Sequence, residues 1–162
     1  MNSMIKVNAI LFLVFSMIYF IDISPVRAEK DIVIEQRINL MRTDVLVNFR
    51  VIKAFVKEGK GSIEEVSAAA KVLAAAADKF LPLFVKGTGR PDVNETKTRS
   101  IQEIWDEWPT FEKANDAMRR NANNIVRQAS EGLTDELEQT FVLLGKEACR
   151  TCHKQFRGPK AN

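Results

Sequence analysis

The stretch "SIEEVSAAAKVLAAAADKF", residues 62–80, decides the fold because it carries both a helix start and a helix face suited to close packing. Ser62 precedes Glu65 by three positions, which is the spacing of a capping box at a helix N-terminus. The alanines allow a neighbouring helix to approach closely, while Leu73 and Phe80 keep the spacing of an apolar helical face. We therefore expect an alanine-rich helix that packs tightly against its neighbours.

Helical periodicity continues on both sides of this stretch, and no run of alternating strand residues interrupts it. Apolar residues at intervals of three and four predict a first helix over about residues 31–58, which Gly59 ends. Pro109 suits the first turn of a third helix that runs to about residue 130, and Thr134 starts a fourth helix. The sequence thus predicts an all-α fold, an antiparallel four-helix bundle.

One connection in this bundle is long. Residues 85–100 are rich in glycine, proline and polar side chains, and they are expected to form a loop, followed by a helical turn around Trp105. Loops of this length are often functional.

The first 28 residues have the features of a secretory signal peptide. Lys6 is followed by an apolar run over residues 9–21, and small residues lie near the cleavage position after Ala28. The run is shorter than the roughly 20 residues that a bilayer core requires, so no stable membrane anchor is expected after cleavage. We predict export to the periplasm and a single domain over residues 29–162.

The charge of the exported domain argues against nucleic acid as a partner. The whole chain carries 24 basic and 21 acidic residues, and removal of the signal peptide leaves 22 and 20. This balance lacks the strong basic excess of a nucleic-acid-binding protein.

Both cysteines and the only histidine lie together in "EACRTCHKQF", residues 147–156. A zinc site would need a further ligand, and a thiol redox site is usually found at the positive end of a helix rather than at its far end. A structural disulfide between Cys149 and Cys152 would close a very small loop and leave His153 without a role. Cys-x-x-Cys-His is the attachment signature of c-type haem, and this interpretation accounts for all three residues.

A haem motif at the end of the last helix of an exported four-helix bundle resembles the cytochrome c′ family, the class II cytochromes c. The resemblance extends over "QRINLMR", "EIW" and "GKEACRTCHKQFR". It implies one covalently bound haem (heme c) near the end of the last helix, with thioether bonds to Cys149 and Cys152 and with His153 as the proximal iron ligand.

The resemblance also implies four further residues at the haem. Arg37 would approach a haem propionate, Thr98 would line the haem edge, Arg157 would lie beside the histidine, and Met41 would face the distal side. Family members commonly form homodimers through their first two helices, which makes a homodimer a candidate assembly here.

Met41 leaves two mechanisms open. In one branch of the family the iron is five-coordinate beneath an apolar residue, and in a low-spin branch resembling cytochrome c556 a methionine at this position is the sixth ligand. Ligation by Met41 favours electron transfer with a small redox protein, whereas an open iron admits nitric oxide or carbon monoxide. We expect an electron carrier rather than an enzyme; a gas-binding cytochrome c′ and a thiol redox bundle without cofactor are the alternatives.

Overall fold

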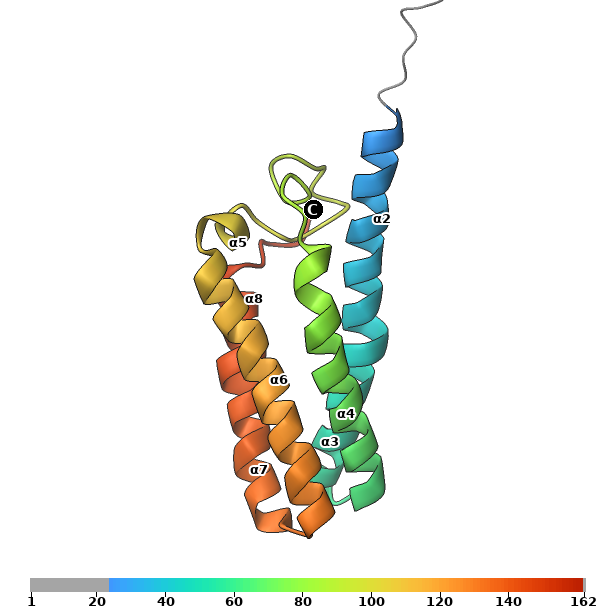
Figure 1. The fold of residues 1–162 in the computed structure, drawn as a ribbon, viewed down its shortest axis with the longest axis vertical. Helices are drawn as coiled ribbons and strands as arrows, with labels where there is room; N and C mark the ends of the chain where they lie inside the picture. Colours follow the sequence, from blue (N-terminus) through green and yellow to red (C-terminus); the bar gives the residue numbers. More distant parts are fainter. Residues whose placement is uncertain (1–23, 162) are drawn as a thin grey trace, which may run out of the picture.

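The computed structural model describes residues 24–161, and within this range every regular element is helical. Four helical segments run antiparallel to one another, which confirms the predicted four-helix bundle (Figure 1). The first two segments comprise α2 (Ser24–Leu40), the π-helical turn η1 (Met41–Val45) and α3 (Leu46–Glu58), then α4 (Ile63–Phe80) with the short turn η2 (Leu81–Leu83). The last two comprise α6 (Trp108–Glu131), then α7 (Thr134–Leu143), the π-helical turn η3 (Leu144–Arg150) and α8 (Thr151–Gln155), while α5 (Glu103–Asp106) is the predicted turn around Trp105.

The start of α4 confirms the predicted capping box. The Ser62 hydroxyl accepts a hydrogen bond from the backbone N–H of Glu65 at 3.2 Å, and the Glu65 carboxylate accepts one from the Ser62 N–H at 2.8 Å. Gly59 ends α3 in the left-handed conformation, with φ of 63°, as its position predicts.

The start of the first helix was predicted wrongly. α2 begins at Ser24, seven residues before the predicted start at residue 31. Pro25 lies in its first turn, where the N–H group that proline lacks is not needed by the helix. Residues 1–23 of the predicted signal peptide lie outside the described residues, and Ala28 is exposed on α2. Cleavage after Ala28 stays a prediction.

The core of the bundle lies mainly between α4 and α6, which pack more extensively than any other pair of helices. Small side chains make this contact close, as the alanine-rich sequence predicts: Ala70 and Ala77 of α4 and Ala117 and Ala122 of α6 are all buried. None of the described helices has both the length and the apolar character that a membrane span requires.

Two π-helical turns interrupt the long helices, and the spacing of buried residues accounts for the first. Leu40 and Val45 are both buried although they lie five positions apart, which is the hydrogen-bonding interval of a π turn. At the end of η3, the hydroxyl of Thr151, the first residue of α8, donates to the Lys146 carbonyl, again five residues back, at 3.1 Å. Both turns lie on segments that carry predicted site residues.

The long loop is tied to the chain segment that follows α8. The Gly158 N–H donates to the Arg99 carbonyl at 2.8 Å, and the Arg99 Nε donates to the Gly158 carbonyl at 2.7 Å. An antiparallel bridge joins Ser100 to Arg157 beside this pair. In Figure 1 the loop, α5 and the C-terminus lie at the same end of the bundle.

Trp105 of α5 anchors the other side of the loop. Its indole Nε1 donates to the Phe84 carbonyl at 2.9 Å. Its ring lies so close to Gly89 that a Cβ there would be 2.3 Å from Cζ3, so only glycine fits. An aromatic cluster fills the core at this end of the bundle, where Phe111 packs against Phe84 and Phe156 with edge-to-face geometry.

Candidate functional site

Cys149, Cys152 and His153 lie where the last helical segment changes from π- to α-helical geometry. Cys149 belongs to η3, and the other two residues belong to α8. Both thiols are free and half-buried, and Cys152 packs against the hydrophobic core, whereas His153 is exposed. The segment therefore presents two sulfur atoms at the edge of the core and an imidazole beside them.

Burial raises the pKa of both thiols. The pKa of Cys152 rises from 9.0 to about 12, first through desolvation and then through the neighbouring Cys149, and desolvation also raises the pKa of Cys149. Reactive thiols in redox sites have a lowered pKa. These thiols are thus poor nucleophiles at neutral pH, which disfavours the thiol redox alternative.

Residues with the donor set of a zinc site do not gather around the motif. In the described part of the chain, no three histidine, cysteine, aspartate or glutamate side chains are placed to hold a metal ion together. A structural zinc ion requires four such ligands.

Arg157 and Arg99 give the surroundings of His153 a positive charge. His153 is exposed at the surface, but the protein atoms around its ring remove part of its hydration and so lower its pKa, and the charges of Arg157 and Arg99 lower it further. The pKa of Arg157 is also lowered, by desolvation and by Arg99. His153 is therefore held neutral, which is the form of imidazole that binds a metal ion.

Arg37 is a buried cation with neutral partners. Its side chain is only 3% exposed, and its Nη1 and Nη2 donate to the Thr88 hydroxyl at 2.8 Å and to the Thr98 hydroxyl at 2.9 Å. Nη2 also donates to the Thr88 carbonyl at 2.5 Å, and the guanidinium lies 4.9 Å from the centre of the Phe84 ring. Desolvation lowers the pKa of Arg37 to about 10.

A buried charge normally has a counter-charge close by. Among the ion pairs of the described residues, none includes Arg37. Its position thus suits an anionic group that is not part of the polypeptide.

The predicted residues fall into three groups in space. Arg37 and Thr98 are in direct contact through a hydrogen bond. Met41 starts η1 and packs, partly buried, against the same hydrophobic core as Cys152. Arg157 lies near His153.

Two contacts at the site, one made by Thr88 and one by Arg99, were not predicted from the sequence. Thr88 is fully buried and binds Arg37, but a threonine between two glycines in a loop carries no periodic signal. Arg99 lies near His153 because the loop pairs with residues after α8, and no local pattern indicates such a long-range contact.

The sequence model of the family described as "Cytochrome C′" matches residues 32–157, which include all of these residues. The chain belongs to the cytochrome c′ family. Cytochrome c′ proteins carry one covalently attached haem c, so this member is a haem protein. The residues present fit that group. Two thiols three positions apart suit its two vinyl groups, and a neutral imidazole suits its iron. Arg37, which is buried and has no ion-pair partner among the described residues, suits a propionate.

Two cytochromes c′ show the degree of sequence similarity. The protein from Halomonas halodenitrificans is 27% identical over 95 residues, 58% of this chain and 71% of its own length. The protein from Allochromatium vinosum is 31% identical over 101 residues, 62% of this chain and 64% of its own length.

Solved structures of the family show the same fold. Cytochrome c′ from Thermochromatium tepidum has a TM-score of 0.70 at 27% identity and covers 80% of this chain and 97% of its own, and a cytochrome c′ with ligand-controlled dimer dissociation has the same values. A ferrous variant of the Alcaligenes xylosoxidans protein with bound NO has a TM-score of 0.66 at 20% identity, covering 79% and 94%.

Proposed function

We propose that this cytochrome c′ is a periplasmic electron carrier whose haem is attached through Cys149 and Cys152 and whose iron is bound by His153. The arrangement of two half-buried thiols beside an exposed, neutral imidazole carries the proposal. The haem supplies one-electron exchange between ferric and ferrous iron.

Each residue has a distinct part in this proposal. The two cysteines would hold the haem at the edge of the core, and His153 would bind its iron. Arg37 pairs with a propionate, and its hydrogen bonds to Thr88 and Thr98 keep the guanidinium in place. Met41 would bind the iron as well, and its ligation would exclude exogenous ligands and favour electron transfer.

The charged groups placed at the proposed site support a carrier rather than an enzyme. Arg37 and Arg157 stay protonated at neutral pH although burial lowers the pKa of each, and they do not exchange protons readily. The predicted signal peptide supports a location outside the cytoplasm.

Attachment is tested by mass spectrometry of the protein expressed in a host that matures c-type cytochromes. We expect the mass of one haem to be added and to survive extraction with acidified acetone, and the Cys149→Ala/Cys152→Ala variant to lose it. A wild-type chain without the added macrocycle would contradict the proposal.

Gas binding is the second candidate function, and the CO-bound and NO-bound forms of the Alcaligenes xylosoxidans protein favour it. Replacing Met41 by leucine keeps the volume of the side chain and removes the thioether ligand. If Met41 binds iron, ferric wild-type protein is low-spin and the Met41→Leu variant is high-spin. A wild type that is already high-spin and binds carbon monoxide when reduced would assign gas binding instead.

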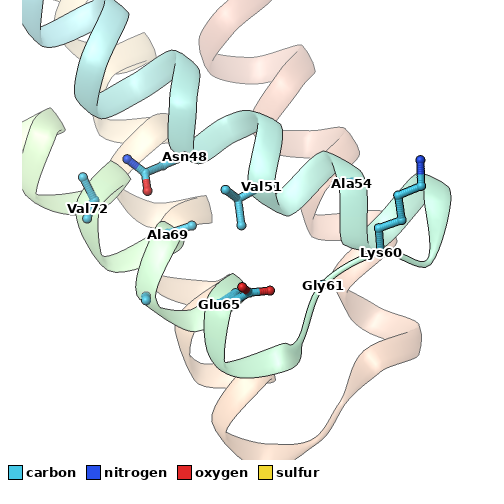
Figure 2. Close-up of a pocket in the computed structure, with 9 residues that line it drawn as sticks. Asn48, Val51, Ala54, Lys60, Gly61, Glu65, Ala69 and Val72 are labelled. Carbon is cyan, nitrogen blue, oxygen red and sulfur yellow. The ribbon is translucent and has the colours of Figure 1, made fainter.

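A homodimer is the proposed assembly. A shallow groove of about 430 Å³ lies between α3 and α4, and Val51, Ala69 and Val72 give it an apolar floor (Figure 2). Val47 beside it is 52% exposed, which is high for a large apolar side chain. A second copy would cover this surface, and the relative with ligand-controlled dimer dissociation supports the assignment.

A further inference from the structure

Three cations form a line on the last helical segment. Lys146, Arg150 and Lys154 are spaced by four and are all exposed, and we call them the basic stripe. A π-helical turn contains more than four residues, and an α-helical turn contains fewer. Over four residues the side-chain direction therefore rotates by less than a full turn from Lys146 to Arg150 in η3 and by more than a full turn from Arg150 to Lys154 in α8, and the two deviations offset each other. The three side chains therefore stay on one face.

Among the described residues these cations have no acidic partners, whereas three arginines of the neighbouring α6 each have one or more. On α6, Arg119 pairs with Asp116 and Asp78, and Arg127 pairs with Glu131. Arg120 pairs with Glu147, the one carboxylate next to the basic stripe in sequence.

No member of the basic stripe takes part in an ion pair within residues 24–161. Like charges four positions apart destabilise a helix. An arrangement that is unfavourable for the isolated chain becomes favourable when an acidic surface meets it.

The basic stripe runs alongside the proposed haem attachment. Arg150 lies between Cys149 and Cys152 in the sequence, and Lys154 follows His153. A protein bound to the stripe would therefore lie against the helix that holds the haem, which is where an electron has to leave or enter.

The stripe has few of the features of a membrane-binding surface. A helix that lies on a lipid surface inserts apolar side chains next to its cations. Val142 and Leu143 are exposed one turn before Lys146, but none of the exposed large apolar residues of the described chain falls within 144–157, beside Arg150 and Lys154.

We propose that the basic stripe is the docking surface for an acidic electron-transfer protein. This inference rests on the proposed electron-carrier function. Docking of this kind raises the association rate through charge complementarity and weakens as salt screens the charges.

The test uses stopped-flow oxidation of ferrous holoprotein by hexacyanoferrate(III), a trivalent anion, in which one electron passes from the haem iron to the probe. We expect the second-order rate constant to fall as ionic strength rises. The Lys146→Glu/Lys154→Glu variant should react at least tenfold more slowly at low salt and lose this dependence. The Lys71→Glu/Lys79→Glu variant has the same charge change on exposed residues of α4, on the other side of the bundle in Figure 1, and should keep most of the wild-type rate.

A second measurement addresses the class of partner. Oxidation by cupric plastocyanin, an acidic redox protein, should show the same order of rates.

If the two double variants slowed oxidation equally, the inference would be overturned while the electron-carrier function would stand. If the holoprotein exchanged electrons with neither oxidant, the electron-carrier function itself would be overturned. If the stripe variant instead lost binding to anionic phosphatidylserine vesicles while keeping its rate with plastocyanin, the surface would be a lipid-binding one.

Discussion

Cys152 combines a position at the edge of the core with an ionisable thiol, and its environment sets its chemistry. Burial beside Cys149 raises its pKa from 9.0 to about 12, so the thiol stays protonated at any physiological pH. A thiol in this state is suited to becoming part of a thioether and unsuited to exchange with disulfides. The buried environment of Cys152 therefore distinguishes a haem-attachment site from a thiol redox site more clearly than the Cys-x-x-Cys spacing does.

This shift predicts a pH dependence for the chain made without haem. The folded pKa of Cys152 lies above the unfolded one, so its contribution to stability is complete below pH 9 and is lost as pH rises towards 12. We expect the free energy of unfolding, measured by urea titration, to fall by up to about 1.4 kcal/mol per pH unit in this window. Holoprotein, whose sulfurs are thioethers, should lack this loss. A haem-free chain with constant stability from pH 9 to 11 would contradict the shift.

A second prediction at this scale concerns Arg99, the arginine near His153 that the sequence motif does not include. Its positive charge favours the reduced state of the haem. We expect Arg99→Gln to lower the reduction potential by about 20–40 mV, equivalent to roughly 0.5–1 kcal/mol for a partly screened charge. Spectroelectrochemical titration measures the change. Arg99→Lys should restore the potential, and an unchanged potential in Arg99→Gln would show that the charge does not reach the haem.

At the scale of elements, helix ends and local spacing were predictable, and long-range contacts were not. The capping box at Ser62 and the stop at Gly59 depend on neighbouring residues only, so the sequence indicates them directly. The π turns were not foreseen, because a five-residue interval such as Leu40 to Val45 is hidden within an otherwise ordinary apolar series. Thr98 was placed at the site by resemblance alone, and its bond to Arg37 depends on how the long loop folds.

The loop also gives a prediction for a single glycine. A Cβ at position 89 would lie 2.3 Å from the Trp105 ring and 3.1 Å from the Ser100 carbonyl, and the ring is held by its own hydrogen bond. We expect Gly89→Ala to destabilise the holoprotein by about 1–3 kcal/mol in chemical denaturation. Gly145→Ala is the control, because nothing lies within 4 Å of a Cβ there and alanine favours a helix. Equal stability of the two variants would rule out tight packing at Gly89.

At the scale of the whole molecule, the proposed dimer surface and the proposed docking surface lie on different parts of the bundle. The groove between α3 and α4 is lined by none of the residues of the haem motif. The basic stripe lies on the last helical segment, which packs against α6 and α3 and lies diagonally across the bundle from α4. The proposed assembly and the proposed electron exchange would thus not compete for the same surface.

The assembly is tested by one charge in the groove. Val51 lies in its floor (Figure 2), and a glutamate there would be buried by a second copy without a partner. We expect wild-type holoprotein to sediment as a dimer and Val51→Glu as a monomer with an unchanged absorption spectrum. Val142→Glu, on an exposed position of α7, should remain dimeric. A monomeric wild type at micromolar concentration would refute the assignment.

The pairing of Arg99 with Gly158 bears on the order of events during biogenesis. Gly158 follows α8, so the loop cannot close onto it until the segment that carries Cys149, Cys152 and His153 has been made. If the chain is exported N-terminus first, as the predicted signal peptide implies, the last helix would dock after the others. We therefore expect haem attachment to precede the closing of this end of the bundle.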